Sequence, residues 1–222
     1  MALCALIFDF DGLIVDTESS SLAMVKAAYR RHGLDLSDDQ WRLCVGSAVD
    51  PYEHLQRLVG PEVNLTEMRE ELELRFQSEV VGLRPRPGVV EFVTTAAAAG
   101  LRLAVASAAS RRWGEGHLAR INILEYFHTI RCLDDVQQAK PAPDVYLEAL
   151  ASVGVSASQA VAFEDSPNGA QAAKTAGIYT VVVPNGVTSG WLFDHADRVI
   201  DSLRRVTISE VAGWLTHRSS FA

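Results

Sequence analysis

Four short, almost continuously apolar segments alternate with stretches of helical periodicity in the second part of the chain. They span residues 101–106, 129–132, 160–163 and 179–183. Strands that are apolar on both faces are typical of parallel sheets that are covered by helices on both sides. The alternation therefore predicts an α/β fold built on a doubly wound parallel sheet.

A further apolar segment lies at the N-terminus, and helical signals follow it up to about residue 84. Ser37 and Gln40 have the spacing of a capping box, and Pro51 suits a first helical position. The simplest arrangement adds the first segment to the sheet and inserts the helices at the carboxyl ends of the strands, where such sheets bind ligands. We expect residues 1–16 and 85–222 to form a Rossmann-like core, and residues 17–84 to form an all-helical cap domain.

The composition excludes several classes of protein. A formal net charge of −8 over 222 residues argues against a surface for nucleic acid or anionic membranes. The three cysteines, Cys4, Cys44 and Cys132, form no C-x-x-C pair, and this usage indicates a reducing compartment. We find no pattern of an export signal or a membrane span. We expect a cytoplasmic protein that binds neither nucleic acid nor membrane, and nothing in the pattern calls for more than a monomer.

The N-terminal apolar segment ends in two carboxylates two positions apart, Asp9 and Asp11, followed by Gly12. Side chains alternate along a strand, so both acids are expected on the same side. The glycine permits a sharp backbone turn, which suits a place where a divalent cation and an anionic substrate meet. Taken alone, the same residues are also typical of a solvated turn.

Three more polar signals follow predicted strands. Ser107, beside the small Ala108, suits a helix cap or a phosphate contact through its hydroxyl and nearby backbone N–H groups. The charge of Lys140 would offset the repulsion between carboxylates and phosphate. Glu164 and Asp165 offer hard oxygen ligands that suit Mg²⁺, which retains water and substrate phosphate as its other ligands. All the signals fall at one edge of the predicted sheet, and this convergence favours one catalytic site over separate caps.

With these motifs, the chain resembles the haloacid dehalogenase superfamily of hydrolases. The similarity covers nearly the whole chain and is to the branch (subfamily I) with a helical cap after the first strand, which contains β-phosphoglucomutase and many sugar-phosphate phosphatases. The residues that carry it are Asp9-Phe10-Asp11-Gly12, Ser107, Lys140, Glu164-Asp165 and the Asp16-Thr17-Glu18 segment that is also typical of the branch.

The resemblance implies a role for each motif. Asp9 would be the nucleophile that forms an aspartyl-phosphate, and Asp11 would protonate the leaving oxygen and then activate water. Mg²⁺ would be held by Asp9, the backbone carbonyl of Asp11 and Asp165, with Glu164 helping directly or through water. The residues expected to contact the phosphate are Ser107, Ala108, Lys140 and Gly12.

Several reactions occur within the superfamily, and the sequence favours one of them. Asp11 favours phosphoryl transfer over dehalogenation, because a halide leaving group needs no proton. Phosphonate hydrolysis is disfavoured because the cap offers few lysines, chiefly Lys26. Mutases of this branch carry a His and an Arg where this chain has Ser21 and Val49, so a phosphatase is favoured over a β-phosphoglucomutase-type enzyme. A non-catalytic binding or regulatory protein would be expected to lack a motif residue, and none is missing.

The expected function is thus the Mg²⁺-dependent hydrolysis of a small phosphorylated metabolite resembling a sugar phosphate. The sequence does not identify that metabolite, because the cap sets the choice. The cap residues expected to contact it are Glu18, Ser21, Trp41, Arg42 and Gly46.

Overall fold

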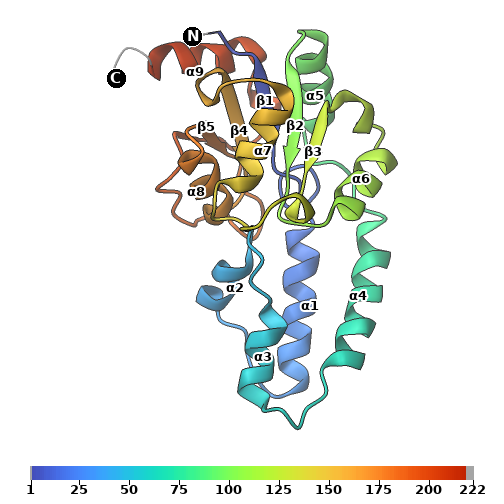
Figure 1. The fold of residues 1–222 in the computed structure, drawn as a ribbon. Coiled ribbons are helices and arrows are strands. Elements are labelled where there is room, and N and C mark those ends of the chain that lie inside the picture. The colour runs from blue at the N-terminus through green and yellow to red at the C-terminus, as the bar shows by residue number, and fades with distance from the viewer. Residues whose placement is uncertain (1, 219–222) are drawn as a thin grey trace.

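The computed structural model describes residues 2–218, and its centre is a six-stranded sheet with the order β3-β2-β1-β4-β5-β6 (Figure 1). All neighbouring strands are parallel. The first strand lies in the middle, so the chain winds outward from it in both directions. The strands are β1 (Ala5–Phe8), β2 (Arg102–Ala106), β3 (Thr129–Arg131), β4 (Ala160–Glu164), β5 (Tyr179–Val182) and β6 (Arg198–Val199). The predicted doubly wound parallel sheet is confirmed.

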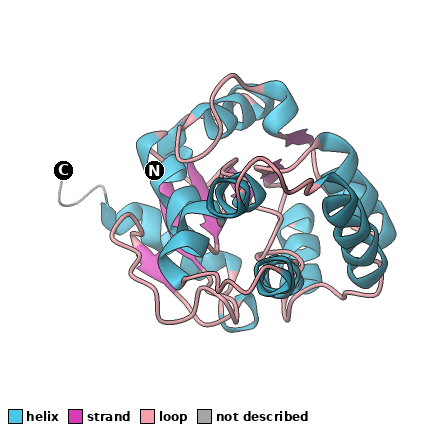
Figure 2. Ribbon diagram, turned by 90° about the horizontal axis from the view of Figure 1, so that it is seen from below, coloured by secondary structure: helices cyan, strands magenta, loops and turns pink. Residues whose placement is uncertain are grey.

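Helices cover both faces of this sheet (Figures 1 and 2). Leu6 and Phe8 of β1 pack toward α5 (Val89–Ala98), α6 (Arg111–Arg120) and α9 (Ile208–Arg218). Ala5 and Ile7 face the other way, toward α7 (Asp144–Val153) and α8 (Pro167–Thr175). Burial on both faces explains why β1 is apolar at every position.

The segment between β1 and α5 forms four helices, which lie beyond the carboxyl ends of the strands (Figure 1). They share a hydrophobic cluster of their own. Each helix contributes one large buried side chain to it: Tyr29, Trp41, Leu55 and Leu72. The predicted capping box at Ser37 is present. The helices are α1 (Glu18–Arg31), α2 (Asp38–Cys44), α3 (Pro51–Val59) and α4 (Thr66–Val80). None of the helices within residues 2–218 has the length and apolar character needed to cross a bilayer.

The chain leaves the sheet and returns to it at adjacent points. Val15 and Pro85 form an isolated antiparallel bridge, and the backbone N–H of Arg86 donates to the carbonyl of Ile14 at 2.8 Å. The guanidinium of Arg86 donates to three further carbonyls, including that of Gly12 at 2.6 Å. The two ends of the insertion are therefore joined to each other and to the loop that carries Asp9 and Asp11.

Candidate active site

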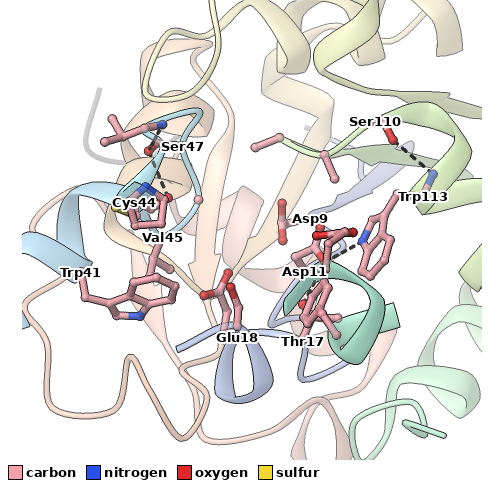
Figure 3. Close-up of a pocket in the computed structure, with 18 residues that line it drawn as sticks. Asp9, Asp11, Thr17, Glu18, Trp41, Cys44, Val45, Ser47, Ser110 and Trp113 are labelled. Carbon is pink, nitrogen blue, oxygen red and sulfur yellow. Dashed lines mark hydrogen bonds between the residues drawn. The ribbon is translucent and has the colours of Figure 1, made fainter. Parts of the chain in front are cut away.

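The two acids that follow β1 lie in a turn. Because β1 ends at Phe8, the alternation of a strand does not place them as the sequence predicted. The backbone N–H of Asp9 donates to the carbonyl of Phe163 at 2.9 Å, and the chain then turns at Gly12, whose φ is +77°. Both carboxylates nevertheless line the same cavity, as predicted (Figure 3).

Lys140 joins two of the predicted motifs beneath this cavity. Its Nζ donates to Oδ1 of Asp9 at 2.6 Å, to Oε1 of Glu164 at 2.6 Å and to the carbonyl of Ala106 at 2.9 Å. The hydroxyl of Tyr146 donates to the same Oε1 of Glu164 at 2.6 Å. Burial alone would lower the pKa of Lys140, but the adjacent carboxylates outweigh burial and raise that pKa. The lysine is therefore a fixed positive charge with all three of its donors engaged.

Three carboxyl groups form a cluster that fits a divalent cation. One oxygen from each of Asp9, Glu164 and Asp165 lies within 4.8 Å of the others, and all three residues are buried. Lys140 occupies one oxygen of Asp9, and the side-chain amide of Asn185 donates to Oδ2 of Asp165 at 2.6 Å. Among residues 2–218, no hydrogen bond reaches the second oxygen of either residue, whereas both oxygens of Glu164 accept hydrogen bonds. Hard oxygen donors in this number suit Mg²⁺. The carbonyl of Asp11 as a ligand stays a prediction.

Burial dominates the electrostatics of this cluster. It raises the pKa of Asp9 to about 8, and it raises the pKa of Asp165 well above its usual value. The neighbouring carboxylates act in the same direction, while Lys140 opposes the shift at Asp9. A cation bound among these acids would supply the positive charge that their ionised forms lack.

Asp11 has a separate environment. Its Oδ1 accepts hydrogen bonds from the hydroxyl of Thr17 at 2.8 Å and from the indole Nε1 of Trp113 at 2.9 Å. Burial raises its pKa even though both hydrogen bonds lower it. A carboxyl group whose pKa lies nearer to neutrality suits general acid and base catalysis. Thr17 and Trp113 hold Asp11 in place, and neither contact was predicted.

The predicted phosphate contacts are placed unequally. Ala108 lines the cavity, whereas Ser107 is buried and does not line it, and its Oγ accepts from the backbone N–H of Ala109 at 3.0 Å. Gly12 does not line the cavity either, and a Cβ on it would fall 2.1 Å from Oδ2 of Asp165. Phosphate binding by Ser107, Gly12 and Lys140 stays a prediction.

The helical insertion supplies the other side of the cavity, whose volume is about 370 Å³. Glu18, Ser21, Trp41 and Gly46 line it, as expected of cap residues that contact a substrate. Arg42 does not line it, and in this respect the structure corrects the expectation. Its guanidinium lies 5.1 Å from the centre of the Trp191 ring, in a cation–π contact with a residue that does not line the cavity.

Other residues of the site were missed. Asn185 is the third residue after β5, so a search for polar residues shortly after every strand would have found it. Tyr146 and Phe76 lie within helices, and their contacts depend on packing between segments that are distant in sequence. Phe76 stacks on Trp113 with ring centroids 5.2 Å apart, which links α4 to the helix beside Asp11.

Comparison with known proteins agrees with this geometry. The family model of the haloacid dehalogenase-like hydrolases matches residues 6–183. The protein YhcW of Bacillus subtilis (strain 168) is 38% identical over 221 residues, which cover 97% of this chain and 98% of YhcW. Hexitol phosphatase B of Escherichia coli (strain K12) is 31% identical over 218 residues, which cover 95% of this chain and 97% of that protein.

A similar structure is also known. It is the crystal structure of a CbbY mutant from Rhodobacter sphaeroides in complex with xylulose-(1,5)bisphosphate. The alignment has a TM-score of 0.74 at 27% identity, and it covers 91% of this chain and 96% of that chain. The chain therefore belongs to the haloacid dehalogenase-like hydrolases, and it is a phosphatase of their helical-cap subfamily.

Proposed function

We propose that this protein is a Mg²⁺-dependent phosphatase that hydrolyses a small, sugar-phosphate-like monoester through an aspartyl-phosphate on Asp9. The observation that carries the proposal is the position of Asp9, which contacts the buried Lys140 on one side and opens onto the cavity beside Asp11 on the other. We assign residues 17–84 to the cap, and residues 1–16 and 85–222 to the core. The name of the similar hexitol phosphatase B supports a sugar-like substrate.

In the first step, a carboxylate oxygen of Asp9 attacks phosphorus, and the bond to the leaving oxygen breaks. Asp11 gives its proton to that oxygen, and the raised pKa of Asp11 favours the protonated form that this step requires. Thr17 and Trp113 hold Oδ1 of Asp11, so the carboxyl group keeps its orientation toward the cavity. The products of this step are the free alcohol and an aspartyl-phosphate.

In the second step, Asp11 accepts a proton from a water molecule that attacks phosphorus. The acyl-phosphate bond breaks, inorganic phosphate leaves and the carboxylate of Asp9 is restored. When bound by Asp9 and Asp165, with Glu164 nearby, Mg²⁺ supplies positive charge to the phosphoryl oxygens. Lys140 keeps Asp9 in position throughout, because the lysine also contacts Glu164 and a backbone carbonyl.

A phosphomutase is the alternative within the family. The positions at which mutases of this branch carry a His and an Arg are occupied here by Ser21 and Val49, and both line the cavity. Neither side chain has the positive charge that would hold the second phosphate of a bisphosphate. The phosphatase is therefore the better proposal.

The test is the release of inorganic phosphate from a panel of sugar phosphates, nucleotides and an aryl phosphate, with Mg²⁺ and with EDTA. We expect release that requires Mg²⁺ and that disappears in Asp9→Asn, while circular dichroism shows an unchanged fold. Turnover near the wild-type rate in Asp9→Asn would contradict the covalent mechanism. Interconversion of a hexose 1-phosphate after addition of its bisphosphate, without phosphate release, would support the mutase.

A further inference from the structure

Asn185 is the first polar residue after β5, and it is only 5% exposed. Its side-chain Nδ2 donates to Oδ2 of Asp165 at 2.6 Å. Asn185 does not line the cavity in front of Asp9, so it does not meet a substrate there. Any effect of Asn185 on the reaction must therefore pass through Asp165, one of the acids that we expect to hold Mg²⁺.

Hydrogen bonds at the other end of the amide determine its orientation. The backbone N–H groups of Val187 and Thr188 donate to Oδ1 of Asn185 at 2.8 and 2.9 Å. The buried hydroxyl of Thr188 donates to the same oxygen at 3.3 Å and accepts from the backbone N–H of Asn185 at 3.0 Å. Because Oδ1 faces these donors, the NH₂ group is the part of the amide that faces Asp165.

The loop that carries Asn185 is itself held in place. The guanidinium of Arg86 donates to the carbonyls of Val183 and Pro184 at 3.0 and 2.6 Å. It also donates to the carbonyl of Gly12 at 2.6 Å, so one side chain joins the loop after β5 to the loop after β1. Movement of Asn185 relative to Gly12 would break these hydrogen bonds, and the amide is therefore a rigid support for its partner.

Oδ2 of Asp165 is enclosed from a second direction. A Cβ on Gly12 would fall 2.1 Å from this oxygen and 2.6 Å from Nδ2 of Asn185, so both side chains pack directly against the glycine. Within residues 2–218, Oδ1 of Asp165 accepts no hydrogen bond. The carboxyl group thus has one oxygen that is engaged and enclosed, and one that is free to bind a cation.

The other acids of the cluster are limited in a similar way. Lys140 donates to Oδ1 of Asp9, and Glu164 accepts hydrogen bonds at both of its oxygens. Asp9 and Asp165 therefore offer one unengaged oxygen each. Mg²⁺ suits such a set, because it binds through one or two carboxylates in octahedral geometry and keeps several waters. Ca²⁺ takes about six to eight oxygens at longer distances, and it often binds both oxygens of one carboxylate.

We propose that Asn185 is a positioning residue that makes the cluster selective for Mg²⁺ over the larger Ca²⁺. The amide holds Oδ2 of Asp165 against Gly12, so the carboxyl group presents only its other oxygen to a cation. Without the amide, the carboxyl group can rotate. Mg²⁺ then loses more affinity than Ca²⁺, because Mg²⁺ requires near-ideal geometry and Ca²⁺ accepts irregular sets of ligands. This assignment rests on the Mg²⁺ dependence proposed above.

The test measures cation binding by isothermal titration calorimetry, with MgCl₂ or CaCl₂ alone and without a phosphate ester. Asn185→Ser removes the donor to Asp165, while the serine hydroxyl can still accept from the backbone N–H groups of the turn. Residues that orient a metal ligand are worth about ten- to a hundredfold in metal affinity, so Kd for Mg²⁺ should rise by about that factor. Kd for Ca²⁺ should rise severalfold less, or fall. An equal change for both cations, or no change, would overturn the inference, because a general loss of structure weakens both alike.

Asn168→Ser is the matched control. Asn168 follows Asp165 by three positions and also donates through its side-chain amide, but its acceptors are the backbone carbonyls of Arg42 and Val45. We expect Asn168→Ser to bind both cations with the Kd values of the wild type. The same loss of preference for Mg²⁺ in both asparagine variants would overturn the role of Asn185.

Thr188→Val and Thr188→Ser decide the inference if Asn185→Ser does not fold. Valine removes the hydroxyl that contacts Asn185, whereas serine keeps it, so we expect only Thr188→Val to lower the preference for Mg²⁺. An identical preference in the two threonine variants would overturn the inference.

The binding experiment separates this inference from the proposed function. A wild-type protein that binds Mg²⁺ but releases phosphate from no ester would contradict the proposed phosphatase, and the ratio of the two Kd values would still decide the role of Asn185. A wild-type protein that binds neither cation would contradict both.

Discussion

The indole Nε1 of Trp113 donates a hydrogen bond of 2.9 Å to Oδ1 of Asp11, a residue 102 positions away in the sequence. Phe76 stacks on the same indole, with planes only 9° from parallel. Asp11 is thus held by α6, and α6 is contacted by α4 of the insertion. The position of the helical insertion is therefore coupled to the group that we propose as general acid and base.

Replacement of Trp113 by phenylalanine should slow the reaction. Trp113→Phe keeps a ring against Phe76 but removes the donor to Asp11, and a hydrogen bond to a charged group is worth about 1.5–3 kcal/mol, so kcat should fall about ten- to a hundredfold. Because this hydrogen bond lowers the pKa of Asp11, its loss should also move the alkaline limb of the pH–rate profile upward. Steady-state phosphate release from pH 5 to 9 measures both effects.

Trp214→Phe is the control for that experiment. Trp214 lies on α9 and stacks on Tyr179, away from the cavity. We expect its profile to match that of the wild type. A similar loss of kcat in both variants would mean that Trp113 contributes only to stability.

Gly46→Ala should weaken the contact between the insertion and the core. Gly46 has a φ of +67°, and a Cβ on it would lie 2.1 Å from Oγ of the buried Ser166. Gly33 has a φ of +69° but no heavy atom within 4 Å of the same position, so Gly33→Ala carries the backbone strain of about 1–2 kcal/mol alone. We expect kcat/KM to fall at least about tenfold more in Gly46→Ala than in Gly33→Ala. Equal activities would contradict a close approach at Gly46.

Asn168 of the core makes a polar contact with the insertion next to Gly46. Its side-chain amide donates to the carbonyl of Val45 at 2.8 Å and to that of Arg42 at 3.3 Å, so it connects α8 to the end of α2. Loss of about 1 kcal/mol of hydrogen bonding in Asn168→Ala should raise KM about fivefold and should affect the melting temperature little. Gln171→Ala, at an exposed position of the same helix, should leave KM unchanged. A KM that is unchanged in Asn168→Ala would show that this contact does not bear on substrate binding.

The metal-free protein should lose stability as pH rises. Burial raises the pKa of Asp9 to about 8, so the folded state holds this proton more tightly than the unfolded chain, in which the pKa is near 4. The resulting stabilisation is complete below about pH 4 and is lost as pH rises to about 8. Melting temperatures in EDTA should therefore fall more steeply between pH 5 and pH 8 for the wild type than for Asp9→Asn.

Mg²⁺ should reverse part of this loss. The cation competes with protons for the carboxylates, so the increase in melting temperature that Mg²⁺ causes should be larger at pH 8 than at pH 5. Calcium offers the same charge with a larger ion and serves as the comparison. A pH-independent increase would contradict binding at the buried acids.

The fold was predictable because its main signal is local. The strands β1, β2, β4 and β5 are apolar at most positions, and this pattern alone indicates a sheet that is covered on both faces. The convergence of Asp9, Lys140 and Glu164 followed from the same argument, since the carboxyl ends of parallel strands meet at one edge. The predicted reason for the pairing of Asp9 with Asp11 was wrong in detail, because the strand ends at Phe8 and the turn at Gly12 orients the acids.

The rest of the site depends on side-chain orientations that are set by contacts between segments distant in the sequence. Arg42 lies on a helix whose residues Trp41 and Cys44 line the cavity, but its guanidinium contacts Trp191, a residue that is distant in sequence. The contact between Trp113 and Asp11 joins a helix to a loop that lies 102 residues earlier in the sequence. No periodicity or cap in either segment indicates it.

The bridge between Val15 and Pro85 bears on how the insertion can change during evolution. Because both ends of the insertion meet at one point on the rim of the sheet, the intervening helices can be lengthened, exchanged or resurfaced without altering the register of any strand. The strands and loops that carry Asp9, Lys140 and Asp165 would keep their positions. Descendants of one ancestral hydrolase can thus acquire new preferences by replacing the insertion, provided that the new helices keep a contact with Trp113 such as the one that Phe76 makes here.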